Sequence, residues 1–432
     1  MAAPTAPSTL TADDPRYAKM FNVEQEAIAL GRTAIEPDLT EEMNRLRERA
    51  PVLKGTPREL LGLPPIQGIL GASRDNYTFL SYAACEQGFQ HNLIFSSAIY
   101  KESQGVQSVG PTILSMVGKE HKRARSVAQP LFKRPRVMDW WKPRWIDATV
   151  AALLDRLQGR DAVDLNLELC ARLPMYTVTR AIGLEGTDAL SFRQHLTRCT
   201  FGQGQATPAQ AAESRAIVDQ ILRELIARRL QEPGDDVITG LLQGDLVLPD
   251  RSTRKLNEDE LFGFCKLVIF AGGGTTWRQL GITIDALLTH DPFWEACRDD
   301  RGLIEDAVDE SLRWRATDPY FPRLCTQDVR VEGVDVPAGA RVFLCLGAAN
   351  HDPAVWDHPD DYDIFRPKAH HLGFGIGPHR CLGVDVAKQE MVAAINGLMD
   401  RWPRLRLDPD LPRPQFVGFD HRGMSAVTVR LQ

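Results

Sequence analysis

The chain of 432 residues lacks the features of several protein classes. It has no run of about eighteen apolar residues, so no membrane-crossing helix is expected. It has no excess of positive charge: 51 Lys and Arg face 57 Asp and Glu, a net charge of −6, which argues against a general nucleic-acid-binding protein. The N-terminus has neither the basic nor the apolar region of a signal peptide. With 43% hydrophobic and 25% charged residues, the composition indicates a globular protein.

The eight cysteines lie apart, and no two form a Cys-x-x-Cys pair. This spacing disfavours a zinc ribbon or an iron–sulfur cluster held by cysteines alone. A long chain without a secretory signal is expected to keep its thiols reduced, so we expect a cytoplasmic location. Residues 1–20, rich in Pro, Ala and Thr, are predicted to form a loose N-terminal arm. No linker or repeat divides the rest, so residues 21–432 are predicted to form a single domain.

Most of the chain has helical periodicity, and strand signals are sparse. Helices are predicted over 206–231, from Asn257 to Asp291, over 303–315, and from just after Cys381 to Trp402. The second helix begins with a capping-box pattern and would be roughly 50 Å long, enough to cross the molecule. Alternating valines around Gly333 and the apolar run 341–344 predict short strands. The predicted fold class is mainly α with small β-sheets.

The most informative segment is 374–383, Phe-Gly-Ile-Gly-Pro-His-Arg-Cys-Leu-Gly, which directly precedes a predicted helix. A thiolate at Cys381 would accept hydrogen bonds from the free amides of that helix and lie at the positive end of its dipole. Gly375 and Gly377 would let the backbone approach a flat group closely. The pattern suits a cysteine beneath a planar metal cofactor. A structural cysteine and a phosphate-binding turn are the alternatives, although Arg380 replaces the third glycine of a dinucleotide motif.

Position by position, this segment resembles the haem-binding motif of the cytochrome P450 superfamily, in which the cysteine supplies the axial thiolate. The resemblance implies the cytochrome P450 fold, with the long central helix crossing the molecule over the haem. It implies haem b as the cofactor and Cys381 as the axial ligand of its iron. Phe374, Gly375, His379 and Gly383 would belong to the same cofactor-binding loop.

Two charged patterns resemble the family as well. Glu310 and Arg313 lie one helical turn apart, and with Arg366 they resemble a buried structural set that positions the cysteine loop. Taken alone, such a pair is more often a solvated surface pair.

His121 and Arg125 also lie one turn apart, and they resemble partners of the haem propionates. Arg323 and His379 resemble the other two members of that set. Together the four groups could compensate two carboxylates at the edge of a buried porphyrin. Without the resemblance, a wet basic helix would be the simpler interpretation of 121–125.

Residues 270–276, Phe-Ala-Gly-Gly-Gly-Thr-Thr, fall in the middle of the long helix. Three glycines there cost about 1 kcal/mol each relative to alanine, so a break between two shorter helices is an alternative. The resemblance assigns a distorted oxygen-binding groove to this segment. Ala271 and Gly272 would contact the cofactor, and Thr275, with Thr276, would act in catalysis, Thr275 by hydrogen-bonding bound oxygen. The family usually has Asp or Glu before this threonine, where this chain has Gly274.

The resemblance implies a haem-thiolate monooxygenase of the soluble bacterial type, which inserts one oxygen atom from O2 into an apolar small organic substrate. A peroxide-driven or oxidative-coupling haem-thiolate enzyme is an alternative that Gly274 keeps open. A haem-thiolate sensor without turnover is a second alternative, which Thr275 and the glycine-rich groove disfavour.

Electrons would have to come from separate proteins, because the chain has neither room for a flavin module nor a cysteine cluster. Reducing equivalents from NAD(P)H would arrive through a ferredoxin-type donor and its reductase. The segment 119–144 contains nine Lys and Arg against two acidic residues, and it would attract an acidic donor. A solvated basic face is the alternative. No nucleic-acid or membrane partner is expected.

Overall fold

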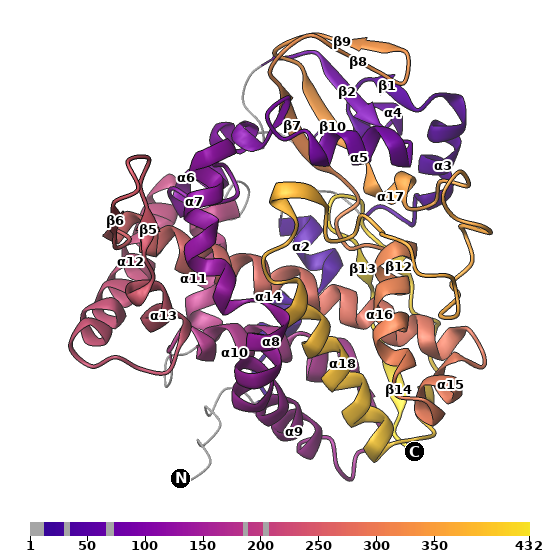
Figure 1. Cartoon of the computed structure of the whole chain (residues 1–432). Helices are drawn as coiled ribbons and strands as arrows, with labels where there is room; N and C mark the ends of the chain where they lie inside the picture. Colours follow the sequence, from indigo (N-terminus) through magenta and orange to yellow (C-terminus); the bar gives the residue numbers. More distant parts are fainter. Residues whose placement is uncertain (1–12, 30–34, 66–72, 185–188, 202–206) are drawn as a thin grey trace.

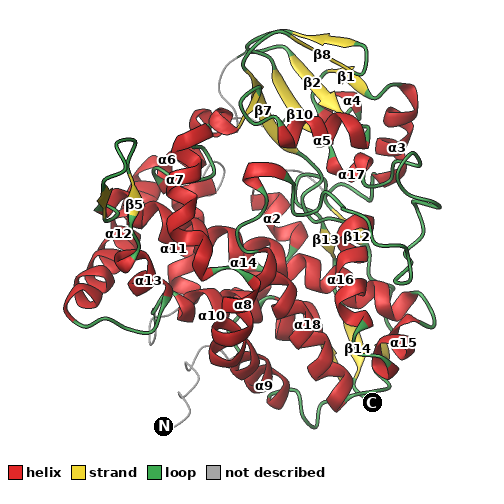
Figure 2. Cartoon of the chain, viewed as in Figure 1, coloured by secondary structure: helices red, strands yellow, loops and turns green. Residues whose placement is uncertain are grey.

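The computed structural model describes residues 13–29, 35–65, 73–184, 189–201 and 207–432. Helices form most of the molecule, and the largest sheet lies at one end of it (Figure 1, Figure 2). The predicted class, mainly α with small β-sheets, is confirmed. No helix in these ranges has the length and apolarity needed to cross a membrane.

The longer helices surround a central one. They are α3 (Thr40–Arg49), α5 (Tyr82–Gln90), α7 (Gly118–Ala128), α9 (Asp147–Asp155), α10 (Arg172–Ala181), α11 (Ala189–Phe201), α12 (Pro208–Gln231), α13 (Val237–Gln243), α14 (Glu258–Thr289), α15 (Phe293–Asp299), α16 (Leu303–Trp314) and α18 (Val384–Arg401). Shorter ones are α1 (Arg16–Met20), α2 (Val23–Ala29), α4 (Pro57–Leu60), α6 (Gln104–Val109), α8 (Arg134–Arg136) and α17 (Leu346–Ala349). Segments of 3₁₀- or π-helix are Ser97–Glu102, Gln129–Leu131, Val137–Ile146, Asn166–Cys170 and Gly377–His379.

The largest sheet has five strands in the order β1 (Val52–Lys54), β2 (Asn76–Phe79), β10 (Arg341–Leu344), β7 (Phe321–Cys325) and β3 (Phe95–Ser96). Only β10 and β2 pair in parallel within it. A second sheet has the order β11 (Arg406–Leu407), β14 (Thr428–Arg430) and β4 (Ala162–Asp164). Three hairpins complete the described strands: β5 (Leu246–Val247) with β6 (Thr253–Arg254), β8 (Val329–Val331) with β9 (Val334–Val336), and β12 (Phe416–Val417) with β13 (Gly423–Met424).

The central helix α14 begins with the predicted capping box. Asn257 Oδ1 accepts from the N–H of Glu260 at 2.9 Å, and Glu260 Oε2 accepts from the N–H of Asn257 at 2.9 Å. The helix is 32 residues long and runs through the middle of the molecule (Figure 1). It packs against α10, α16 and α18. The alternative of two shorter helices is therefore excluded.

The prediction of a loose arm over 1–20 is wrong for the part that the structure describes, while residues 1–12 lie outside it. Tyr17 and Phe21 are each 2% exposed. The Arg172 guanidinium lies 3.8 Å from the centre of the Tyr17 ring, and the Phe21 ring contacts Trp277 edge to face at 5.8 Å. Two aromatic rings in an otherwise polar segment bury enough apolar surface to hold it on α10 and α14.

Candidate active site

The loop before α18 folds back on itself. The N–H of Gly375 donates to the C=O of Leu372 at 2.8 Å, and the N–H of Cys381 donates to the C=O of Phe374 at 2.9 Å. Gly375 and Gly377 have φ angles of +62° and +72°. A Cβ at Gly377 would also lie 2.8 Å from the C=O oxygen of Phe89. Both positions therefore require glycine.

The thiol of Cys381 faces an enclosed space. Its side chain has accessible surface, whereas the other seven cysteines are buried. Protein nevertheless surrounds the thiol, and this burial raises its pKa. The N–H of Gly383 and the charges of Arg125 and Arg380 oppose the rise in pKa. A Cβ added at Gly383 would meet no atom within 4 Å, so the backbone there borders open space. One amide donor and two cations at the sulfur thus partly offset the effect of burial on the thiolate.

Four cationic or donor side chains gather beside this loop. The imidazole rings of His121 and His379 lie 3.9 Å apart between centroids. Burial, then the charge of Arg125, lowers the pKa of His121 to about 4. Burial, then the charges of His121, Arg323 and Arg125, lowers the pKa of His379 to about 3. The structure thus brings all four predicted propionate partners together, and among the described residues no carboxylate acts on either imidazole.

One atom of this cluster lacks a partner. His121 is 2% exposed, and its Nε2 forms no hydrogen bond within the described part of the chain. A buried polar atom without a partner is costly, and so is a group of buried cations without a counter-charge. The two carboxylates of a haem would supply both the missing charge and the missing partner. The donor set therefore fits haem propionates.

Two further members of the cluster were not predicted from the sequence. Ser97 Oγ lies 3.1 Å from His379 Nε2 and donates to the C=O of Met116 at 2.9 Å. The Tyr100 hydroxyl forms a hydrogen bond with Arg323. Burial raises the pKa of the Tyr100 phenol, and the charge of Arg323 opposes this rise. The antiparallel pairing of β3 with β7 brings Ser97 and Tyr100 next to Arg323. That pairing joins segments more than 200 residues apart in the chain, so no local pattern could have indicated it.

On α14, Ala271 and Thr275 lie one turn apart on the same face. Ala271 is exposed and Thr275 is half-exposed, although the helix runs through the middle of the molecule. Both residues therefore border an internal space, and Thr275 Oγ1 donates to the C=O of Ala271 at 3.2 Å. Thr276 is only 5% exposed, in contrast to Thr275, and its catalytic role stays a prediction.

Two of the three consecutive glycines of α14, Gly272 and Gly273, allow close packing of neighbouring helices. A Cβ at Gly272 would lie 2.7 Å from Val178 Cγ2 of α10, and one at Gly273 would collide with Nη1 of Arg193 of α11. The helix assignment is uninterrupted through all three glycines. The missing side chain of Gly272 thus allows close approach to α10, and its contact with the cofactor stays a prediction.

Glu310 and two arginines form a buried network. Glu310 accepts hydrogen bonds from Arg313 Nε and Nη2, both at 2.8 Å, and from Arg366 Nε at 3.1 Å. The exposed side-chain fractions are 7% for Glu310, 1% for Arg313 and 9% for Arg366. The structure therefore unites the three residues, and they are not a solvated surface pair.

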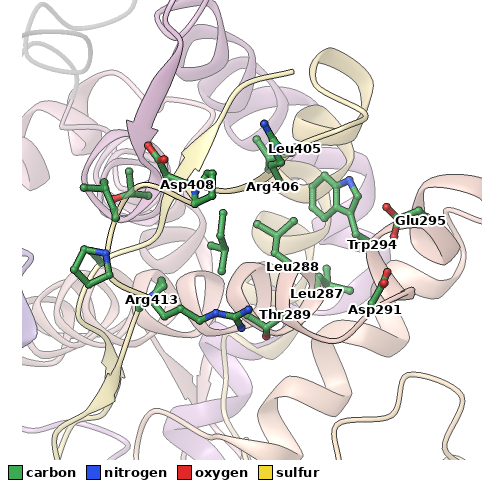
Figure 3. Close-up of a pocket in the computed structure, with 17 residues that line it drawn as sticks. Leu287, Leu288, Thr289, Asp291, Trp294, Glu295, Leu405, Arg406, Asp408 and Arg413 are labelled. Atoms are coloured by element: carbon green, nitrogen blue, oxygen red, sulfur yellow. The ribbon is translucent and has the colours of Figure 1, made fainter.

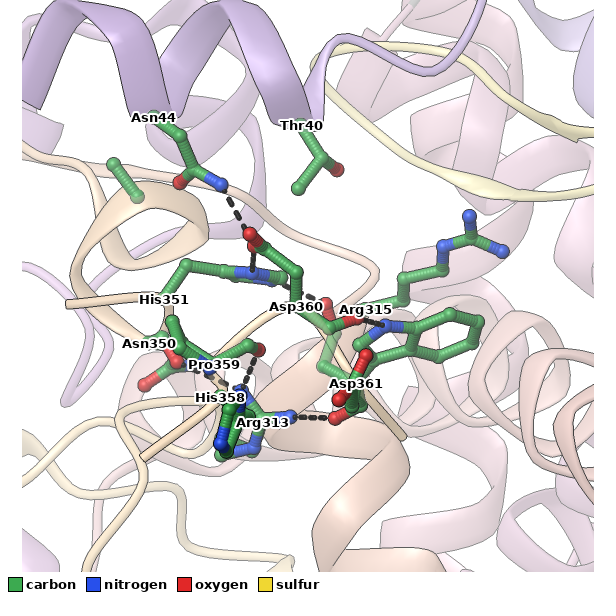
Figure 4. A network of polar contacts seen from close by, with 12 residues as sticks. Thr40, Asn44, Arg313, Arg315, Asn350, His351, His358, Pro359, Asp360 and Asp361 are labelled. Carbon is green, nitrogen blue, oxygen red and sulfur yellow. Dashed lines mark hydrogen bonds and ion pairs between the residues drawn. The ribbon is translucent and has the colours of Figure 1, made fainter. Parts of the chain in front are cut away.

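The same arginines bind the backbone of the segment 350–361. Arg313 donates to the C=O groups of Asn350, Pro359 and Asp361 at 3.0, 2.6 and 2.8 Å (Figure 4). Asn350 in turn accepts from the N–H of Leu372 at 2.8 Å through its Oδ1. Leu372 is the residue whose C=O closes the Gly375 turn. An uninterrupted chain of hydrogen bonds therefore connects Glu310 with the cysteine loop.

A separate pocket of about 570 Å³ lies at the C-terminal end of α14 (Figure 3). Leu287, Trp294 and Arg413 are among the residues that line it. None of the residues of the cysteine loop, the cationic cluster or the Ala271–Thr275 face contributes to it. It is therefore not the space that Cys381 faces.

Comparisons with known proteins agree with this site. The cytochrome P450 family model matches residues 209–410. Cytochrome P450 107B1 of Saccharopolyspora erythraea is 34% identical over 326 residues, 74% of this chain and 78% of the relative. The biotin biosynthesis cytochrome P450 of Bacillus subtilis is 31% identical over 325 residues, 72% of this chain and 78% of the relative.

The fold is likewise shared with solved structures. The structure of CYP109E1 from Bacillus megaterium in complex with testosterone aligns with a TM-score of 0.78 and 22% identity, covering 91% of this chain and 99% of that one. The loop, the cationic cluster and the relatives lead to the same conclusion. The chain belongs to the cytochrome P450 family and is a haem-thiolate monooxygenase.

Proposed function

We propose that this enzyme inserts one oxygen atom from O2 into an apolar small organic substrate, within a single catalytic domain over 21–432. The carrying observation is the enclosed thiol of Cys381 beside two arginines and two imidazoles with which no carboxylate pairs in the described part of the chain. Ala271 and Thr275 border an internal space on α14, which packs against α18, the helix that follows the thiol. This combination supports an oxygen-activating site over a sensor.

A haem with a thiolate ligand supplies oxygen activation, because the thiolate favours cleavage of the O–O bond. In the proposal, the N–H of Gly383 and the charges of Arg125 and Arg380 stabilise the negative charge on Cys381. His121, Arg125, Arg323 and His379 bind the propionates, with Ser97 and Tyr100 orienting His379 and Arg323. Thr275 donates its own proton to Ala271, so its oxygen is left to accept from water over the cofactor.

Turnover with two oxidant systems tests the proposal. The purified holoprotein is supplied with NAD(P)H, a ferredoxin and its reductase, or with hydrogen peroxide alone. Product formation with the redox chain and O2 is expected. Turnover with peroxide alone would favour the peroxide-driven enzyme, the alternative that Gly274 keeps open.

Thr275→Ala should raise peroxide release relative to product, because the hydroxyl that orders water beside Ala271 is lost. A difference of about 1.4 kcal/mol between the competing steps changes their ratio tenfold. The measurement is the yield of product and of peroxide per NAD(P)H consumed. Thr276→Ala is the matched control, since Thr276 is buried, in contrast to Thr275. An unchanged ratio in Thr275→Ala would show that the enzyme does not use this threonine for proton delivery.

For the electron donor, we propose the basic surface on the cysteine side of the molecule. Lys119, Lys122, Lys133 and Arg136 are exposed there, and no carboxylate pairs with them among the described residues. Arg134, Lys142 and Arg144, by contrast, pair with Glu305, Asp147 and Asp235. The segment Val137–Ile146 packs against α18, the helix that follows Cys381. This arrangement suits an acidic ferredoxin-type donor.

Lys133→Glu should slow reduction of the holoenzyme by an acidic ferredoxin, and rising salt should slow the wild type, because exposed charges are screened beyond about 8–10 Å. Stopped-flow reduction rates at several ionic strengths measure both effects. Arg330→Glu, on the exposed β8–β9 hairpin, is the control and should leave the rate unchanged. Rates indifferent to Lys133→Glu and to salt would rule out this docking surface.

A further inference from the structure

A partly buried arginine lies against the part of α14 where the family resemblance predicts an acid. Arg193 of α11 directs its two terminal nitrogens at α14: Nη1 towards Gly273 and Nη2 towards Gly274. A Cβ at Gly274 would lie 3.3 Å from Nη2 and within 4 Å of no other neighbouring group. Gly274 therefore lets the guanidinium lie close to the backbone of α14, one residue before Thr275.

This guanidinium has no counter-charge in the described part of the chain. Arg193 forms no ion pair there, and its aromatic neighbour is the Phe21 ring, 5.5 Å from the guanidinium carbon. Burial alone lowers the pKa of Arg193 to about 10, with no opposing carboxylate. Arg193 keeps some accessible surface although protein surrounds it, as Cys381 does, so it also borders an internal space.

A second arginine increases the positive charge at the same point. Arg278 is 5% exposed, and its Nη1 donates to the C=O of Gly274 at 2.5 Å. Burial lowers the pKa of Arg278 to about 10, and Asp318 is the carboxylate that opposes this. Gly274 thus lies close to two guanidiniums. For Arg193, which pairs with no carboxylate in the described part of the chain, burial of the charge is costly unless an anion accompanies it.

We propose that a carboxylate binds to Arg193 in the internal space that Arg193 and Thr275 border, either as part of the substrate or as a small ion beside it. The planar guanidinium presents paired N–H donors that match the two oxygens of a carboxylate. The ligand would thereby supply the acidic group that the chain lacks next to Thr275. This inference rests on the proposed oxygenase site and narrows its substrate to an apolar body that carries, or binds together with, a carboxylate.

Spectral titrations of the ferric holoenzyme test the site with dodecanoate and 2-naphthoate, each compared with its methyl ester. The wild type should bind each acid at least tenfold more tightly than its ester. Arg193→Gln should abolish the preference, because it removes the charge and keeps much of the side-chain volume. Gly274→Asp should abolish it too, because the new carboxylate occupies Arg193. Arg198→Gln, an exposed position on the same helix, should retain the preference.

Adding acetate to the ester titrations identifies the source of the carboxylate. If acetate tightens ester binding in the wild type but not in Arg193→Gln, the bound carboxylate is a free ion. If acetate has no effect and the acids still bind more tightly than the esters, the bound carboxylate belongs to the substrate. If the acids bind to the wild type no more tightly than their esters, the proposed carboxylate site is wrong. The same conclusion follows if neither the acids nor the esters bind. A preference for the acids that survives Arg193→Gln would also show that the site is wrong. Absence of the red-shifted carbon monoxide band in the wild type would instead overturn the proposed function.

Discussion

Cys381→Ser should abolish the red-shifted Soret band of the reduced, carbon-monoxide-bound protein and, with it, monooxygenase turnover. The band depends on a soft thiolate ligand, and a serine hydroxyl is a hard, neutral donor. Burial raises the pKa of the Cys381 thiol, whereas the Gly383 amide and the charges of Arg125 and Arg380 lower it and would stabilise the anion as an iron ligand. None of these groups gives a serine comparable acidity.

The matched control is Cys297→Ser, on α15. This cysteine is fully buried, and burial raises the pKa of its thiol to about 12. Its replacement should leave the band in place, even if it costs some stability. Far-ultraviolet circular dichroism would show that both variants fold. A Cys381→Ser protein that keeps the wild-type band would refute the assignment of the axial ligand.

The sequence predicted the parts of this protein that depend on local patterns. The capping box at Asn257 placed the start of α14 correctly, and the alternating valines around Gly333 predicted the β8–β9 hairpin. The loop around Cys381 is also local, because its turn depends on two glycines and one proline within a few residues. Such features are encoded by neighbouring residues and can be recognised without knowledge of the tertiary structure.

What the sequence could not predict depends on contacts between distant segments. Ser97 and Tyr100 reach the cationic cluster only because β3 pairs with β7. The glycines of α14 suggested a distorted helix, whereas their neighbours Val178 and Arg193 come from other helices. Tyr17 is buried because α10 and α11 offer a surface to it, although its own segment has the composition of a loose arm. Composition and periodicity contain no information on such partners.

The environment of Arg193 gives a structural meaning to the absence of an acid at position 274. From the sequence, Gly274 indicates only that a family carboxylate is absent. In the structure, the same glycine leaves a guanidinium without a counter-charge. In the proposed site, an acid at this position would pair with Arg193, whereas Gly274 leaves the positive charge of Arg193 for a ligand. The proposal therefore concerns which substrates bind, in addition to how protons arrive.

Glu310→Gln should destabilise the holoenzyme by about 3–5 kcal/mol, because it leaves Arg313 and Arg366 buried without their common counter-charge. Urea unfolding and the ratio of haem to protein after gel filtration measure the effect. The matched control is Asp335→Asn, which removes an acid from an arginine on the exposed β8–β9 hairpin; a surface pair of this kind contributes little.

Loss of haem distinguishes this prediction from plain loss of stability. Arg313 holds the C=O of Asn350, Asn350 holds the N–H of Leu372, and Leu372 closes the turn that presents Cys381. If this chain of bonds positions the thiolate, Glu310→Gln should lose haem at urea concentrations well below those that unfold the helices. Glu310→Asp, which keeps the charge, should recover part of the haem content. Simultaneous loss of haem and helix in Glu310→Gln would mean that the network stabilises the whole fold without specifically positioning the cysteine loop.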